Sequence, residues 1–417
     1  MGLIALVPLL WQRAAFAELF WFGDEWDLLS QIDRMGFWNW TWHVFAENFV
    51  PVFKLLWGGG VYLFSGSYLA MLVLMWLTHA INTIQLGRVL RAAGFSWFAV
   101  LLTQAVFGLT AVNIETLGWT VQWSAVLATT FMLFALEWHV RRPAHTGPLS
   151  WRRHGVLLLL SAGSALSFSR GVLTGAVLAL GSFLPSADAG PSRLGRRALG
   201  AAVCLLPAMV VALIIVVFAS GNHQKLSGHL ADAALYGLWY FCLNPLHRLV
   251  AIDSWGPVTT TLAGVIKVAL MAWVLVRSKG SPRRLLVLLL AFDLGNSALL
   301  GIGRYHTGLE TSISSRYQYG ALVGVLPFAG LWLDLLWQRV PPLFHRWQLV
   351  PAAVVIAAAL LAARPWARDA AEFARGRGTV TRELLQQPAP PAMGAVPGIP
   401  FLSTERAKEL AARYHLH

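Results

Sequence analysis

Three carboxylates follow the first apolar stretch of the chain. Asp24, Glu25 and Asp27 lie within four residues, directly behind the aromatic run Phe20-Trp21-Phe22. A carboxylate at the mouth of a helix bundle can take a proton from a hydroxyl group, and a pair can hold a hard divalent cation such as Mg²⁺ or Mn²⁺. Acids also favour the first turn of a helix for structural reasons. The spacing alone leaves both interpretations open.

A second set of candidate residues is basic. Arg170, Arg304 and Arg316 each lie in a short segment between two apolar runs, the latter two accompanied by His306 and Tyr317. Arginine binds phosphate through bidentate, permanently charged hydrogen bonds, so these residues are candidates for a phosphate clamp. The alternatives are anchors to lipid headgroups or structural ion pairs.

Composition identifies the elements that must position these groups. The chain has 417 residues, of which 57% are hydrophobic and 12% charged, about half the charge of a soluble domain. Apolar runs of bilayer-spanning length recur along the chain, and backbone groups in lipid must be paired internally, so an all-α integral membrane protein is predicted. The net charge of +13 is assigned to short loops rather than to nucleic-acid binding. We expect about eleven spans, near 2–22, 67–88, 96–112, 118–138, 155–168, 171–185, 198–218, 258–276, 285–302, 318–337 and 348–363.

Basic residues predict the orientation. With the N-terminus in the cytoplasm, the inner loops hold about twice as many Lys and Arg residues as the outer loops, as the positive-inside rule requires. This places 23–66, 219–257 and 303–317 outside. The transmembrane domain then covers 1–363, and 364–417 forms an extracytoplasmic tail, which ends in a helix capped by Ser403. Arg13 and Glu18 interrupt the first span.

The first outer loop, 23–66, is predicted to contain two interfacial helices, one behind Asp24 and one beginning near Pro51. Four tryptophans in this loop are candidates for a platform that stacks against a sugar or an acceptor: Trp26, Trp38, Trp40 and Trp42.

An acidic pair after the first span, followed by two interfacial helices and then the second span, resembles the GT-C superfamily of membrane glycosyltransferases. Asp24-Glu25 resembles the Asp-Glu pair of protein mannosyltransferases, and Glu47-Asn48-Phe49-Val50-Pro51, Gly66 and His79 resemble the layout of bacterial members. The resemblance covers about the first 140 residues in layout and the remainder only in helix number. Where some families of this superfamily carry a second acidic motif, this chain has the single acid Glu115.

The resemblance implies transfer of a sugar from a polyprenyl-phosphate-linked donor to a glycan, lipid or protein acceptor, at the outer face of a bacterial inner membrane. Asp24 or Glu25 would be catalytic. The donor phosphate would lie at Arg316, Arg304 and Arg170, with Tyr317 and His306. A divalent cation, if used, would lie at Asp24, Glu25 and Glu115. Contacts to sugar or acceptor are expected from Asp27, Trp42, His43, Glu47 and Glu115.

Two other classes stay open. A transporter or lipid flippase would need charges along a midplane path, and Lys267 with Asp293 as its partner is the one indication of it. A glycan polymerase or ligase of another membrane fold would use the Arg and His residues of 219–257. His79 and Asn82, about one helical turn apart, are expected to form an interhelical hydrogen-bond pair. The sequence does not predict the oligomeric state.

Overall fold

The computed structural model describes residues 2–45, 48–141, 151–184, 194–218, 226–249, 256–341, 349–362, 371–386 and 402–417, together with the single residues 368 and 399. Within these ranges the chain is folded almost entirely into helices, as the composition predicts. Glu47, a predicted contact residue, lies outside them.

Six of the described helical segments are long and apolar enough to cross a membrane. Three of these segments extend slightly beyond a named helix. They are Thr120–Arg141 with α9 (Trp123–Arg141), Gly280–Thr307 with α16 (Gly280–Arg304), and Ser315–Trp337 with α17 (Gln318–Trp337). The other three are α6 (Tyr68–Ala92), α12 (Leu194–Phe218) and α15 (Pro257–Arg277). A seventh span results if α7 (Trp97–Leu109) is joined to Ala111–Gly118 across a 45° bend.

The expected count of eleven spans is therefore not confirmed. Residues 2–22 are divided among η1 (Gly2–Leu6), α1 (Val7–Trp11) and α2 (Arg13–Glu18), with the break next to the charged Arg13. Three other expected spans are short helices in the described ranges: α10 (Trp151–Ala165), α11 (Val172–Phe183) and α18 (Leu349–Ala362). At about 1.5 Å per residue they are shorter than the roughly 30 Å apolar layer of a bilayer.

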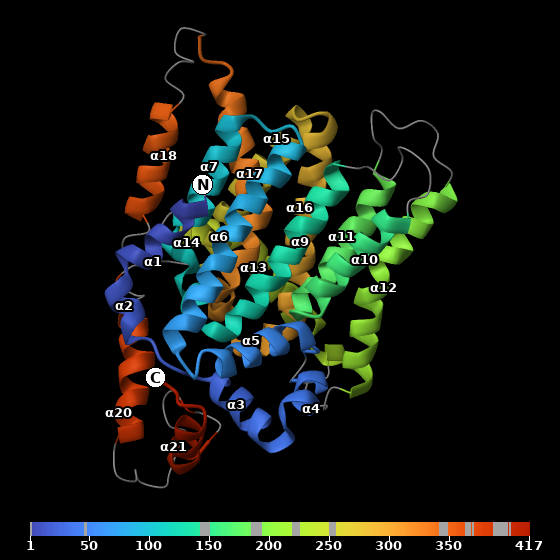
Figure 1. Ribbon diagram of the computed structural model, residues 1–417. Helices are drawn as coiled ribbons and strands as arrows, with labels where there is room; N and C mark the ends of the chain where they lie inside the picture. Colours follow the sequence, from blue (N-terminus) through green and yellow to red (C-terminus); the bar gives the residue numbers. More distant parts are fainter. Residues whose placement is uncertain are drawn as a thin grey trace.

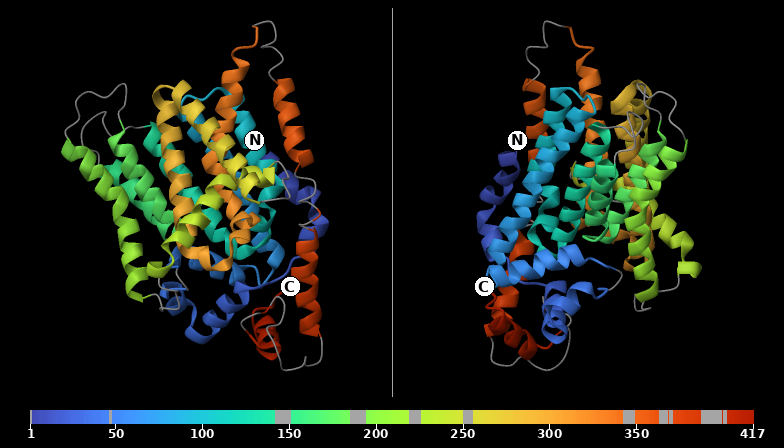
Figure 2. Two further views of the ribbon diagram at one scale, coloured as in Figure 1. Left: turned by 180° about the vertical axis from the view of Figure 1, so that it is seen from behind. Right: turned by 45° about the vertical axis from the view of Figure 1, so that its right-hand side comes forward.

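The loop 23–66, predicted to be the first outer loop, folds as helices at one end of the bundle. In Figure 1, α5 (Pro51–Leu63) runs across the lower ends of the long helices, and α3 (Asp24–Met35) and α4 (Phe37–Trp42) lie beneath it. The tail helices α20 (Val380–Gln386) and α21 (Thr404–Arg413) reach the same end, which Figure 2 shows from two further sides. The two helices expected in this loop are present, and their position in the membrane interface stays a prediction.

A cluster of indole rings attaches this loop to the bundle. Trp21, Trp26, Trp40 and Trp57 are fully buried, and the rings of Trp21 and Trp57 meet edge to face at 5.7 Å. Lys54 of α5 is also fully buried, and its Nζ donates hydrogen bonds of 2.8 Å to the carbonyl oxygens of Trp40 and His43. The loop is thus an ordered cap with its own polar anchor.

Polar pairs inside the bundle match two expectations. Lys267 Nζ lies 2.6 Å from Asp293 Oδ2, both side chains are inaccessible to solvent, and Nζ also donates to the carbonyl oxygen of Phe241 at 2.7 Å. His79 Nδ1 lies 3.0 Å from the Tyr319 hydroxyl, to which Asn82 donates at 2.9 Å. The Lys267–Asp293 pair and the interhelical role of His79 and Asn82 are confirmed.

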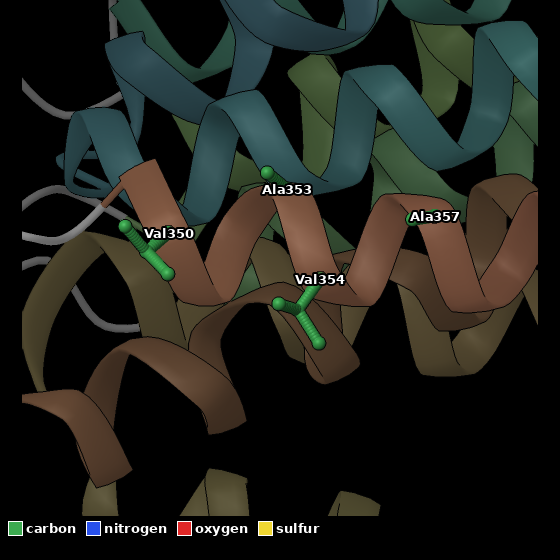
Figure 3. A pocket seen from close by; sticks show the side chains of 4 residues that line it. All are labelled: Val350, Ala353, Val354 and Ala357. Atoms are coloured by element: carbon green, nitrogen blue, oxygen red, sulfur yellow. The ribbon is translucent and has the colours of Figure 1, made fainter.

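An apolar groove lies on α18, toward the end of the molecule away from α3 (Figures 1 and 3). Its lining consists of Val350, Ala353, Val354 and Ala357. These aliphatic side chains offer no group for acid–base or anion chemistry, so this groove is not a candidate active site.

Candidate active site

The site begins at the N-terminus of α3. Gly23 precedes the helix with a φ of +57°, a conformation that favours glycine, and the Trp26 indole donates a hydrogen bond of 3.1 Å to the carbonyl oxygen of Trp21. The turn places Asp24, Glu25 and Asp27 in the first turn of the helix, where its dipole stabilises negative charge. Both interpretations of the acidic run require this geometry.

Glu25 is fully buried and both of its oxygens are occupied. Oε2 accepts a hydrogen bond of 2.7 Å from the Phe22 amide, and Oε1 accepts from the amide of Thr120 at 3.1 Å, from its hydroxyl, and from the Tyr68 hydroxyl at 3.5 Å. Burial raises the pKa of Glu25 to about 8, against the opposing effect of the Thr120 and Phe22 hydrogen bonds. Glu25 therefore joins α3 to α6 and to the start of the Thr120–Arg141 segment.

Asp24 has a different environment. Its side chain is partly exposed, and burial raises its pKa while the positive charges of Arg304 and Arg316 oppose that rise. Asp27 raises the pKa of Asp24 further, and Arg377 lowers it. The fold thus brings Asp24 close to two of the three predicted phosphate-binding arginines, which lie far along the sequence.

Arg304 and Arg316 differ in their exposure and in the contacts that hold them. Arg304 is exposed at the C-terminal end of α16, beside the exposed His306. Arg316 is partly buried in the short helix η8 (Ser315–Tyr317), with its guanidinium 5.2 Å from the centroid of the Tyr317 ring. Arg316 Nε is buried and has no hydrogen-bond partner.

Glu115, in α8 (Ile114–Gly118), holds the segment that carries Arg316. Its Oε2 accepts hydrogen bonds from the Ser315 hydroxyl at 2.6 Å, the Ser314 hydroxyl at 3.2 Å and the Arg316 amide at 3.1 Å. Its Oε1 lies 3.4 Å from Arg377 Nη2. A direct contact of Glu115 with sugar or acceptor stays a prediction.

These contacts bear on the expected cation. The oxygens of Glu25 and Glu115 already accept hydrogen bonds from separate groups of donors. Within the described part of the chain, no group of three or more His, Cys, Asp or Glu side chains could hold a metal ion. Asp24, Glu25 and Glu115 therefore do not fit a shared Mg²⁺ or Mn²⁺ site.

Arg377 is a site residue that the sequence interpretation missed. It lies in the tail, in the π-helical turn η10 (Arg375–Thr379), and its guanidinium carbon is 3.4 Å from the ring centroid of Phe373 and 4.4 Å from that of Phe22. Burial lowers its pKa to about 10. The sequence shows only the basic run Arg375-Gly376-Arg377-Gly378, in a segment predicted to lie outside, and nothing in that run indicates that Arg377 reaches Glu115.

The third arginine, Arg170, does not belong to the group of charges that act on Asp24. It belongs to η4 (Ser169–Gly171), is only 8% exposed, and interacts electrostatically with Tyr240 and Tyr319 inside the bundle. A Cβ at Gly320 would lie 2.6 Å from Arg170 Nη1, so glycine makes room for the guanidinium. Its link to the segment of Arg316 is indirect, through Tyr240, whose hydroxyl donates a hydrogen bond of 2.9 Å to the carbonyl oxygen of Tyr317.

The aromatic candidates divide by exposure. Trp26 and Trp40 are fully buried, so the expectation that they form a platform is wrong: they pack the loop against the bundle. Trp42 is 59% exposed and Trp38 is 67% exposed, and both can meet a ligand. His43 is exposed at the end of α4, and Asp27, partly exposed, accepts a hydrogen bond of 2.9 Å from Gln31.

No protein-family model matches the sequence, and no curated protein matches it significantly. Among solved structures, the apo oligosaccharyltransferase of Archaeoglobus fulgidus aligns with 96% of this chain and 61% of its own, at 12% identity and a TM-score of 0.49. The archaeal oligosaccharyltransferase AglB from the same organism, in complex with an inhibitory peptide and a dolichol-phosphate, aligns with 92% of this chain and 58% of its own, at 11% identity and a TM-score of 0.47. This chain thus spans about three fifths of the length of these structures. A likeness at this level assigns no role to any residue.

Proposed function

We propose that this protein is a membrane glycosyltransferase that transfers a sugar from a polyprenyl-phosphate-linked donor to a hydroxyl of a glycan, lipid or protein acceptor. The observation that carries the proposal is the juxtaposition of Asp24 with Arg304 and Arg316 at one end of the bundle. The three groups are a base and an anion-binding pair, which are the two functions that displacement of a phosphate by a hydroxyl requires.

The reaction balances with these residues. The acceptor oxygen forms a bond to the anomeric carbon while the bond from that carbon to the phosphate oxygen breaks, and the leaving phosphate keeps the electron pair. The proton of the acceptor hydroxyl passes to Asp24. Arg316 and Arg304 neutralise the charge that grows on the leaving phosphate. Attack from the side opposite the phosphate inverts the anomeric centre.

The environment of Asp24 suits a general base. Partial burial raises the pKa of the carboxyl group, which strengthens it as a base, and the positive charges of Arg304 and Arg316 oppose that rise. Glu25 has no exposed surface and its oxygens are engaged, so we assign it the positioning of α3 rather than proton transfer.

The proposed orientation puts this site outside the cell membrane, with the N-terminus in the cytoplasm and the bacterial inner membrane as the location. The contacts of Glu115 with Ser315 and Arg377 support it, because they join two segments, 303–317 and the tail, that the charge distribution assigns to the outer side.

The features behind the other two classes have structural explanations here. Lys267 and Asp293 form a closed ion pair without solvent access, so they offer no charge to a transported solute. Arg248, in the loop proposed for a polymerase or ligase, donates a hydrogen bond of 3.1 Å to the carbonyl oxygen of Ile313.

Asp24→Asn tests the proposal in purified protein reconstituted in lipid, with a panel of polyprenyl-phosphate-linked sugars as donors. Loss of the base should lower kcat by roughly 100-fold or more with donor binding retained. Asp232→Asn, at an exposed aspartate of α13 (Leu230–Leu243), is the matched control and should keep the wild-type rate. Arg316→Ala should weaken binding of a short-chain polyprenyl phosphate by roughly tenfold or more. A wild-type rate in Asp24→Asn would overturn the assignment of the base.

A further inference from the structure

The C-terminal tail is attached to the site end of the molecule at two places. At the first, Arg382 Nη2 donates a hydrogen bond of 3.3 Å to the carbonyl oxygen of Leu19, and a Cβ at Gly378 would lie 1.4 Å from the carbonyl oxygen of Glu18. Backbone therefore lies directly on backbone there, and only glycine allows it. The turn that holds Arg377 is fixed by this contact.

At the second place, the end of the chain docks on the first outer loop. Arg406 and Arg413 of α21 both form ion pairs with Asp33 of α3. The amide of Tyr68 donates a hydrogen bond of 3.0 Å to the carbonyl oxygen of His417, and the His417 amide donates to that of Gly66 at 3.2 Å. The tail thus contacts both the helix that carries Asp24 and the start of α6.

Arg377 links the tail to the segment of Arg316 and to the acidic residues at the start of α3. It pairs with one oxygen of Glu115, whose other oxygen holds the Ser315 hydroxyl and the Arg316 amide. Its positive charge also acts on Asp24 and on Glu25. Arg377 Nη1 is buried without a hydrogen-bond partner, although a buried donor left unpaired is unfavourable. A side chain held in this way at a cost to stability points to a role beyond packing.

We propose that Arg377 is a positioning residue of the active site, which orients Arg316 through Glu115 and supplies a fixed positive charge beside Asp24, so that the tail is an integral part of the catalytic unit. This inference rests on the proposed glycosyltransferase function.

The test compares Arg377→Gln with Arg375→Gln, in the full-length protein reconstituted in lipid. Arg375 belongs to the same turn, and its Nε donates only to the carbonyl oxygen of Ala371, at 3.4 Å and in an exposed position. Each variant is assayed for kcat and donor KM across pH, and for binding of a short-chain polyprenyl phosphate.

For Arg377→Gln we expect a rise in donor KM of roughly tenfold, because Arg316 loses its orientation. We also expect the acid limb of the activity profile to move to higher pH. The charges that face Asp24 are Arg304, Arg316, Arg377 and Asp27, and removal of one of the three positive ones raises the pKa of the base. Arg375→Gln should match the wild type in both measurements. A purely structural role of Arg377 would lower the amount of folded protein without moving the acid limb.

If Arg377→Gln does not fold, Arg377→Lys keeps the charge without the planar guanidinium. It should keep the wild-type acid limb and raise the donor KM several-fold. A wild-type donor KM in whichever variant folds, or an acid limb unmoved in Arg377→Gln, overturns this inference alone. A wild-type protein that neither transfers sugar nor binds the polyprenyl phosphate overturns the proposed function and this inference with it.

Discussion

Glu25→Gln should destabilise the protein at acid pH and stabilise it at alkaline pH. The pKa of Glu25 is about 8 in the folded protein against 4.5 in an unperturbed glutamate, so the folded state binds a proton over this interval that the unfolded state releases. The contribution of Glu25 to the free energy of unfolding of the wild type must therefore fall as pH rises from 4.5 to 8. At about 1.4 kcal/mol per pH unit, the decrease from this group is about 5 kcal/mol.

Glutamine is neutral throughout this range, so the variant should lack this slope. Glutamine has a cost of its own, because its NH₂ group cannot accept a hydrogen bond, whereas both oxygens of the protonated Glu25 carboxyl group can accept from Phe22 and Thr120. One lost hydrogen bond is worth about 1 kcal/mol. We therefore expect Glu25→Gln to be less stable than the wild type near pH 5 and more stable above pH 8, with the two curves crossing between.

Thermal unfolding followed by tryptophan fluorescence measures this in detergent, and the 20 tryptophans of the chain give a strong signal. Glu372→Gln, at an exposed glutamate of the tail, is the control and should follow the wild-type curve. Parallel curves for Glu25→Gln and the wild type over pH 5 to 9 would show that Glu25 stays ionised in the folded protein, held by its four donors, and the reasoning from burial would be wrong.

Two further variants test the packing around the site and in the bundle. Lys267→Met leaves Asp293 buried without its partner and should destabilise the protein by about 3–5 kcal/mol. The double variant Lys267→Met with Asp293→Leu should be destabilised clearly less. Equal losses of stability in thermal unfolding would contradict this account of the pair. Gly378→Ala puts a methyl group 1.4 Å from a backbone oxygen and should release residues 371–386 to faster hydrogen exchange, whereas Gly376→Ala, with nothing within 4 Å, should not; unchanged exchange in both would show that the tail docks without the Gly378 contact.

Hydropathy predicts the long helices well and the short ones poorly. The six long segments, including α6 and α12, were expected because their apolar runs are continuous. An apolar run does not show where a helix ends, however. Residues 2–22 break near Arg13, and the expected spans at 155–168 and 171–185 form helices of 15 and 12 residues that pack against their neighbours.

The site residues that could be predicted are charged residues in short segments next to apolar runs. Asp24, Arg304 and Arg316 met that criterion, and the fold brings them together. The sequence could not show which role each candidate residue has, because the role depends on whether the side chain is buried. Trp40 and Trp42 are two residues apart, yet one is core and the other is 59% exposed. Arg377 was missed because a contact across more than 260 residues with Glu115 leaves no local pattern.

The acidic pair itself shows why the two neighbours must differ. Successive residues on an α-helix do not share a face, so Asp24 and Glu25 at the start of α3 cannot both point into one cavity. Glu25 takes the protein side, where Thr120 and Tyr68 meet it, and Asp24 is left on the side of Arg304 and Arg316. In the proposed function, the adjacent acids therefore have separate roles: Glu25 fixes the helix, and Asp24 is held beside the arginines as the base.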